Sequence, residues 1–341
     1  MKKIIFILFL LIQVFHPCLA MTIDQIVIFG DSLSDTGNVF SLTSKAHRII
    51  SQIPIVPKDP PYYQGRFSNG PIWIDELVKT MNIPLIDYAY GGSWAESITN
   101  SKFYNPIGLG VQIELYRAAA ILDFHKDQHL YIIWSGANDY LDGRDDAESA
   151  TTNTIESIRS DIETLIYMGA KHIMVMNIPD LGVVPGVVAK GKDFAEAVGH
   201  LSQLHNQKFV AMMEEEKKNN PNIQIISLDI ESHFDDMILH PDKYQLKNVT
   251  EACYDGGYAL VNQHVDIATQ DAMKKIGIDI EHSLSLKTAY LAAKAYEMGT
   301  EHICFNPDEY LFWDQVHPTT KVHTELSVYV YNKLLQNDVH S

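Results

Sequence analysis

Residues 26–35 read IVIFGDSLSD, an apolar run that passes directly into a turn. Ile, Val and Phe favour a buried strand, and Gly, Asp and Ser favour the turn that follows it. Ser32 therefore lies where a strand ends, with its hydroxyl beside a turn. A serine hydroxyl attacks poorly on its own, so the position suits a nucleophile only if the chain also supplies a base, an orienting carboxylate and oxyanion donors.

A second stretch, near the carboxyl end of the chain, offers the base and the orienting group. Residues 313–318 read WDQVHP. Because side chains three residues apart lie on the same side of one turn, Asp314 can hold one ring nitrogen of His317 while the other faces Ser32. Taken separately, each motif is also compatible with an ordinary turn. Their joint occurrence favours a catalytic arrangement.

Short apolar runs alternate with longer helical stretches along most of the chain. We expect strands at residues 25–29, 84–87, 130–134, 172–176 and 223–228, and helices at 71–81, 110–125, 147–168 and 194–218. The alternation predicts an α/β fold, a three-layer, doubly wound parallel sheet with helices on both faces. Active groups in such sheets lie beyond the carboxyl ends of the strands. Ser32, Gly92 and Asn138 follow the first three strands.

Four separated blocks of the sequence resemble the GDSL, or SGNH, hydrolase family, and they occur in the family's order. They are residues 30–33 (GDSL), 89–93 (AYGGS), 136–139 (GAND) and 314–318 (DQVHP). Lesser matches at 65–70, 177–182 and 312–314 resemble the branch that holds bacterial secreted phospholipases, lysophospholipases A and glycerophospholipid:cholesterol acyltransferases. The resemblance implies a flavodoxin-like SGNH-hydrolase fold, ester hydrolysis and no cofactor.

The same resemblance implies a role for each of five residues. Ser32 would be the nucleophile, His317 the general base and then acid, and Asp314 the residue that orients His317. The oxyanion hole would consist of the backbone N–H groups of Ser32 and Gly92 and the side-chain N–H of Asn138. Fixed donors aimed at a developing oxyanion each lower the barrier by about 3 kcal/mol.

One position departs from the family's pattern. The family often has Asn five residues before the glycine of the second block, and this chain has Asp87 there. We therefore expect different hydrogen bonds around residue 87, with no consequence for the role of Gly92.

The amino-terminal residues 1–20 are typical of a secretory signal. Lys2 and Lys3 precede an apolar run from Ile4 to Phe15, which is too short for a stable membrane anchor. We expect cleavage after Ala20, a single domain at residues 21–341, and export to the periplasm or the extracellular space. Later segments stay well short of the roughly 18 consecutive apolar residues that a spanning helix needs, so no stable membrane anchor is predicted.

The charge of the chain limits its partners. Without residues 1–20, 24 Lys and Arg side chains remain against 43 Asp and Glu, a formal net charge of −19. Such a charge opposes binding to nucleic acid and capture by anionic lipid. We expect a lipid or other ester substrate held by apolar and aromatic contacts, and the resemblance adds a sterol as a candidate acyl acceptor.

Two cysteines remain once Cys18 leaves with the signal. Cys253 and Cys304 form an even pair in an exported protein, which predicts a disulfide. A zinc site would enlist His302, but two cysteines and one histidine fall short of four ligands. The other histidines lack metal-ligand spacing, so no metal is expected.

The predicted disulfide closes a segment of 50 residues, 254–303, that contains a helical stretch around residues 285–296. We treat it as a helical excursion from the single domain. Two interpretations remain open. The disulfide is a structural staple, or the excursion restrains access to the site and an activating protease relieves it.

A second unusual segment, residues 41–64, contains four prolines and Tyr62-Tyr63. We expect an irregular loop near the site. It is either a plain surface connection or a wall of an acyl-chain groove.

Together these features predict a secreted serine ester hydrolase that acts on phospholipid or lysophospholipid acyl esters through an acyl-serine intermediate. Such an intermediate also permits acyl transfer to an alcohol such as a sterol. A carbohydrate or short-chain esterase of the same fold is an alternative, because fold does not choose the substrate. A non-catalytic secreted binding protein is the alternative from another class.

Overall fold

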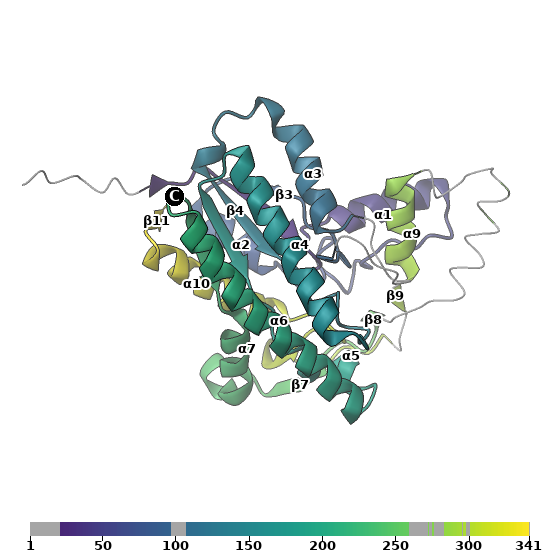
Figure 1. Cartoon of the computed structure of the whole chain (residues 1–341). Helices are drawn as coiled ribbons and strands as arrows, with labels where there is room; N and C mark the ends of the chain where they lie inside the picture. Colours follow the sequence, from purple (N-terminus) through teal and green to yellow (C-terminus); the bar gives the residue numbers. More distant parts are fainter. Residues whose placement is uncertain are drawn as a thin grey trace, which may run out of the picture.

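A five-stranded parallel sheet forms the centre of the computed structural model, which describes residues 21–96, 107–258, 272, 275, 283–294, 296–297 and 301–340 (Figure 1). The spatial order is β3 (Leu85–Asp87), β2 (Gln25–Gly30), β4 (His129–Trp134), β5 (His172–Met176) and β6 (Gln224–Leu228). This is the flavodoxin-like order. The predicted doubly wound α/β fold is therefore confirmed.

Helices and short strand pairs surround this sheet. The helices are α1 (Asn38–Ile49), α2 (Trp73–Met81), α3 (Leu109–Ala119), α4 (Ala147–Met168), α5 (Pro185–Val188), α6 (Lys192–Asn219), α7 (Ile230–Leu239), α9 (Leu284–Lys294) and α10 (Thr320–Gln336), with single 3-10 turns at η1 (Ala120–Leu122), η2 (Lys126–Gln128), η3 (Leu181–Val183), η4 (Pro241–Tyr244) and η6 (Pro307–Glu309). The strand pairs are β1 (Met21–Thr22) with β11 (Val339–His340), β7 (Asn248–Ala252) with β10 (Tyr310–Phe312), and β8 (Gly257–Tyr258) with β9 (Tyr296–Glu297).

Side chains of the central strands alternate between two apolar layers, as the pleat requires. Ile26 and Ile28 of β2 pack in one layer with residues of α2 and α10. Val27 and Phe29 of the same strand pack in the other layer with residues of α3 and α4. Since both faces are covered, the strands are mainly apolar, which is why the sequence predicted them.

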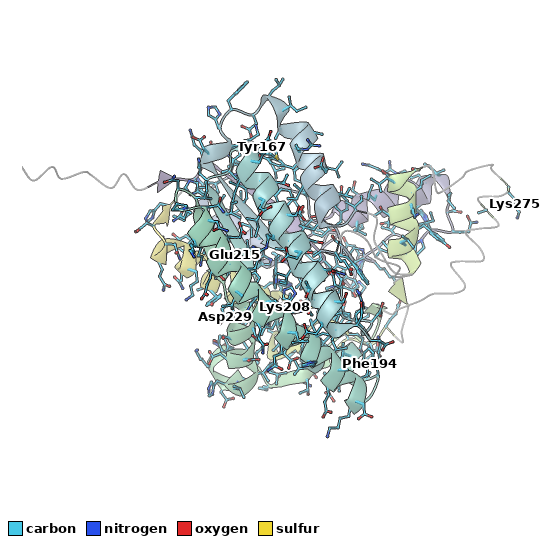
Figure 2. The ribbon with its side chains drawn as sticks, viewed as in Figure 1. Tyr167, Phe194, Lys208, Glu215, Asp229 and Lys275 are labelled. Carbon is cyan, nitrogen blue, oxygen red and sulfur yellow. A yellow bond between two sulfur atoms is a disulfide. The ribbon has the colours of Figure 1, made fainter. Side chains whose placement is uncertain are left out.

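Helices α4 and α6 lie side by side over one face of the sheet (Figure 1). Lys208 of α6, labelled in Figure 2, donates hydrogen bonds to the backbone oxygen of Glu148 and to the hydroxyls of Thr151 and Thr152 on α4. Within the described residues, no helix combines the length and the apolar character needed to cross a membrane.

Two of the expected elements are wrong in part. The helix expected at 110–125 ends at Ala119 and continues as the 3-10 turn η1. The segment 41–64 is not irregular throughout, because α1 extends to Ile49. The buried face of α1 consists of Val39, Thr43 and Ala46. Such small and partly polar side chains give a weak apolar pattern, so the helix was not predicted.

The predicted disulfide between Cys253 and Cys304 is confirmed, with the two Cα atoms 4.8 Å apart. Within the excursion at 254–303, α9 packs on α1 through Ala289 and Ala293 (Figure 1). The predicted helix around 285–296 is thus present, although Tyr296 belongs to β9. Much of the excursion, and the predicted signal at residues 1–20, lie outside the described residues.

Candidate active site

The candidate site lies at the carboxyl edge of the parallel sheet. Ser32 follows β2, Gly92 follows β3 and Asn138 follows β4. These three strands are adjacent and parallel, so the loops that leave them meet at one edge. Asp314 and His317 come from the loop that connects β10 to α10.

Ser32, His317 and Asp314 form a continuous chain of hydrogen bonds. Ser32 Oγ lies 2.9 Å from His317 Nε2, and His317 Nδ1 lies 2.8 Å from Asp314 Oδ2. The exposed fractions of the three residues are 6%, 1% and 0%. This is the geometry in which an imidazole can take a proton from a serine hydroxyl while a carboxylate fixes its tautomer.

Asp314 is ionised in this environment. Burial alone would raise the pKa of its carboxyl group, but the charge of His317 and the hydrogen bonds donated by His317 and Tyr62 together hold that pKa below its usual value. Its Oδ1 also accepts the backbone N–H groups of Val316 and His317, at 2.8 and 2.7 Å. The carboxylate therefore orders its own loop as well as the imidazole.

The block at residues 65–70 holds the His317 loop in place. Ser68 donates its hydroxyl to the backbone oxygen of Pro318 at 2.9 Å, and Asn69 accepts the backbone N–H of Thr320 at 2.8 Å. The Phe67 ring lies 5.2 Å from the His317 ring. The block at 65–70, which the sequence indicated only through its family resemblance, thus holds the loop of His317 in place.

The three expected oxyanion donors are available to a ligand. Within the described residues, the backbone N–H groups of Ser32 and Gly92 donate to no protein acceptor. Asn138 donates one side-chain N–H to the backbone oxygen of Ser93 at 3.0 Å, which leaves its second N–H. Gly92 has a φ of +76°, a conformation that favours glycine.

Hydrogen bonds from buried polar side chains connect these loops. The sequence did not indicate these side chains. Gln112 of α3 bonds both the N–H and the C=O of Gly30 and donates to the Ser93 hydroxyl at 2.8 Å. Asp35 accepts the Gly91 N–H at 2.9 Å. Asp35 lies within the stretch 26–35, two residues beyond the GDSL block, whereas Gln112 lies in no motif at all.

Asp139 joins the third loop to the second. Its two carboxyl oxygens accept the backbone N–H groups of Ala95 and Glu96 at 2.9 and 2.8 Å. Burial raises the pKa of this carboxyl group to about 7, although the same N–H groups act in the opposite direction. The side chain next to Asn138 therefore holds the loop that carries Gly92.

Asp87, the position that departs from the family's pattern, is well bonded. Its carboxyl oxygens accept the backbone N–H of Thr36 at 2.8 Å, the Thr36 hydroxyl at 2.6 Å and the Ala89 N–H at 2.7 Å. Burial, reinforced by the negative charge of Asp35, raises the pKa of the Asp87 carboxyl group to about 8. The loop before Gly92 is thus ordered by a carboxyl group.

An apolar pocket opens onto Ser32, Asn138 and His317. About 640 Å³ of empty space lies in and in front of it, open solvent included. The wall away from these residues comes mainly from apolar side chains of η3, α7 and the neighbouring loops, which are Leu141, Leu181, Val183, Val184, Phe234 and Ile238. Three carboxyl groups, Asp31, Asp180 and Asp235, also line it. Its apolar wall offers a surface on which an aliphatic chain could pack beside the serine.

The segment 41–64 contributes no lining residue to this pocket, so its interpretation as a wall of an acyl-chain groove is not supported. The described part of the excursion at 254–303 contributes none either. The pocket is lined instead by the end of the block at 177–182, which runs into η3, and by α7, for which no functional signal was found in the sequence.

Two buried histidines outside this site have structural contacts. His129 lies between Asp24 and Asp123, at 2.8 and 2.9 Å, and the Tyr140 hydroxyl bonds His205. Among the described residues, His, Cys, Asp and Glu side chains form no group that could hold a metal ion.

A serine, a histidine and an aspartate joined in this way at the edge of a flavodoxin-like sheet are typical of a serine hydrolase. The model of the family described as GDSL-like Lipase/Acylhydrolase matches residues 26–329. The chain belongs to this family.

Several known proteins are similar to the chain. A phosphatidylcholine-sterol acyltransferase of Aeromonas hydrophila is 31% identical over 309 residues, which cover 89% of this chain and 88% of that protein. A thermolabile hemolysin of Vibrio parahaemolyticus is 24% identical over 92% of this chain and 64% of its own length. Among solved structures, a possible lipase of Chitinophaga pinensis is 14% identical, with a TM-score of 0.42 and coverage of 92% and 98% of the two chains.

The first prediction concerns the hydrogen-bonded chain. Ser32→Ala and His317→Ala should each lower the turnover of an activated ester by roughly 10⁴-fold or more, and the double variant should lose little beyond either, because the residues act as a unit. His125→Ala, at an exposed histidine, is the matched control. Steady-state kinetics of the four variants test this, and near-normal turnover by either single variant would remove that residue from the site.

The second prediction concerns Asn138. Asn138→Ala removes one oxyanion donor and should lower kcat by about 10²-fold to 10³-fold with KM little changed. Thermal unfolding should be measured in parallel, because the variant also loses the hydrogen bond to Ser93. An unchanged kcat would show that Asn138 does not contact the transition state.

Proposed function

We propose that this protein is an exported lipid acyl hydrolase that cleaves the acyl ester of a phospholipid or lysophospholipid through an acyl-Ser32 intermediate. The observation that carries the proposal is the apolar pocket that opens onto Ser32 and His317. A pocket of this composition gains free energy by removing an aliphatic chain from water, at about 25 cal/mol per Å² of buried apolar surface.

The reaction would proceed in two halves. His317 Nε2 takes the proton of Ser32 as Oγ bonds to the ester carbonyl carbon, and the N–H groups of Ser32, Gly92 and Asn138 bind the resulting oxyanion. The C–O bond to the leaving alcohol then breaks, and His317 returns the proton to that oxygen. Asp314 orients the imidazole throughout and stays ionised.

The second half transfers the acyl group from Ser32. His317 takes a proton from water, and the hydroxide oxygen bonds to the acyl carbon as the bond to Ser32 Oγ breaks and the proton passes to Oγ. An alcohol can replace water in the same step, which would make an ester instead of a free acid. The similarity to a phosphatidylcholine-sterol acyltransferase supports a sterol as the alcohol to test first.

Export and surface charge fit the same proposal. The signal-like residues 1–20 and the disulfide between Cys253 and Cys304 support an oxidising compartment. With a formal net charge of −17 for the whole chain, attraction to an anionic membrane is disfavoured. Neutral or zwitterionic lipids in loosened or micellar form are therefore the preferred substrates.

The third prediction assigns the acyl chain to the pocket. Ile238 lines it, and Ile238→Trp should fill part of it. We expect kcat/KM for palmitoyl lysophosphatidylcholine to fall by about 10-fold to 100-fold, while kcat/KM for p-nitrophenyl acetate stays within about threefold. The matched control is Leu239→Trp, because Leu239 is the next residue but 72% of it is exposed.

Acyl release should be measured across phosphatidylcholine, lysophosphatidylcholine, p-nitrophenyl esters and acetylated sugars, with and without cholesterol as acceptor. The proposal is supported if the protein prefers the long-chain lipids and Ile238→Trp abolishes that preference. Preference for acetylated sugars or short esters, unaffected by Ile238→Trp, would contradict it and favour the carbohydrate or short-chain esterase.

A further inference from the structure

Besides His317, a second residue forms a hydrogen bond with Asp314 Oδ2. The Tyr62 hydroxyl donates to Asp314 Oδ2 at 2.5 Å, and the same oxygen receives His317 Nδ1 at 2.8 Å. Tyr62 is only 2% exposed and lies 252 positions away from Asp314 in the sequence. It belongs to the proline-containing segment 41–64, which contributes no lining residue to the apolar pocket beside Ser32.

The position of the Tyr62 ring is set by its neighbours and not by the hydroxyl alone. The ring meets Tyr254 edge-on at 5.8 Å and Trp313 edge-on at 6.3 Å. Tyr254 and Trp313 are themselves stacked at 5.5 Å, and the Tyr254 N–H donates to the Trp313 backbone oxygen at 2.6 Å. This aromatic packing fixes where the hydroxyl lies, so the hydrogen bond to Asp314 is preorganised.

The segment after Cys253 packs against the Tyr62–Asp314 pair. A Cβ atom added at Gly257, whose φ is +99°, would lie 2.0 Å from the Tyr62 hydroxyl oxygen and 3.4 Å from Asp314 Oδ2. The main chain therefore packs directly on the hydrogen bond. In a site this buried, a carboxylate stays ionised only if protein groups donate hydrogen bonds to it.

We propose that Tyr62 is a positioning residue of the catalytic centre, which acts on His317 through Asp314. The inference rests on the proposed esterase function. By donating to Oδ2, Tyr62 takes up part of the negative charge of the carboxylate, keeps that oxygen aimed at His317 Nδ1, and limits how strongly Asp314 stabilises the imidazolium.

Other titratable groups also face His317, and their contribution must be held constant. Asp31 lies in the turn after β2, and burial raises the pKa of its carboxyl group to about 6, while the charge of His317 acts in the opposite direction. His323 lies on α10, and burial together with the charge of His317 lowers its pKa to about 3. Neither has a hydrogen bond to Tyr62, so a comparison of variants isolates the effect of the hydroxyl.

The fourth prediction is for Tyr62→Phe, which removes the hydroxyl and keeps the ring. On p-nitrophenyl acetate, kcat should fall by roughly tenfold with KM unchanged. The acid limb of the kcat/KM profile should move to higher pH, because an Asp314 carboxylate with one donor fewer stabilises the imidazolium more. Tyr63→Phe is the matched control, since Tyr63 is the next residue and is 36% exposed.

Two further measurements separate positioning from packing. In proton NMR, the low-field resonance of His317 Nδ1–H should move further downfield in Tyr62→Phe. Asp314 Oδ2, 2.8 Å from Nδ1, then accepts no other hydrogen bond, while Oδ1 stays 3.0 Å from Nδ1. A fluorotyrosine at position 62 is a stronger donor, so it should move the acid limb in the opposite direction, to lower pH.

The proposal is overturned if kcat and the pH profile of Tyr62→Phe equal those of the unaltered protein. It is also overturned if activity and unfolding temperature fall together while the acid limb and the resonance stay in place, since Tyr62 would then act only through packing. The resonance is observed without turnover. If the unaltered protein cleaves no ester but its resonance responds to position 62, the function is wrong and the positioning role stands.

Discussion

Buried carboxylates that gather backbone N–H groups hold the loops of the candidate site together. Asp35 accepts four of these groups, from Gly37, Asn38, Val39 and Gly91. Asp139 accepts two from the loop that carries Gly92, and Asp314 accepts two from its own loop. A parallel sheet brings the ends of its strands to one edge, but it does not fix the loops beyond them. The carboxylates provide that order.

This arrangement has a cost in free energy that the donors only partly offset. Burial raises the pKa of Asp35 to about 6 and that of Asp139 to about 7, even though their N–H partners favour the charged form. Asp314 differs, because the charge of His317 and the hydrogen bonds from His317 and Tyr62 together lower its pKa despite burial. The catalytic pair is thus the place where a buried negative charge is best balanced, which suits a group that must stay ionised while the imidazole gains a proton.

The sequence was sufficient for the sheet, and the residues that it predicted for the site lie together in the structure. Strands buried on both faces are mainly apolar, and residues 172–176 and 147–168 have the predicted bounds. Helix α1 was not predicted, because its buried face is made of Val39, Thr43 and Ala46, which give a weak apolar pattern. Gln112 and Tyr62 could not be assigned a role, since a single long-range hydrogen bond leaves no periodic or spacing signal. The pocket wall on α7 depends on how loops fold over the sheet, which no local pattern contains.

The central claim is that Ser32 is a nucleophile activated by His317, and covalent labelling tests it most directly. A fluorophosphonate probe should modify the unaltered protein at one residue, found by peptide mapping to be Ser32, and should label His317→Ala far more slowly and Ser32→Ala not at all. Labelling that is absent from the unaltered protein, or that persists in Ser32→Ala, would contradict the account and favour a binding protein that keeps the scaffold of a hydrolase.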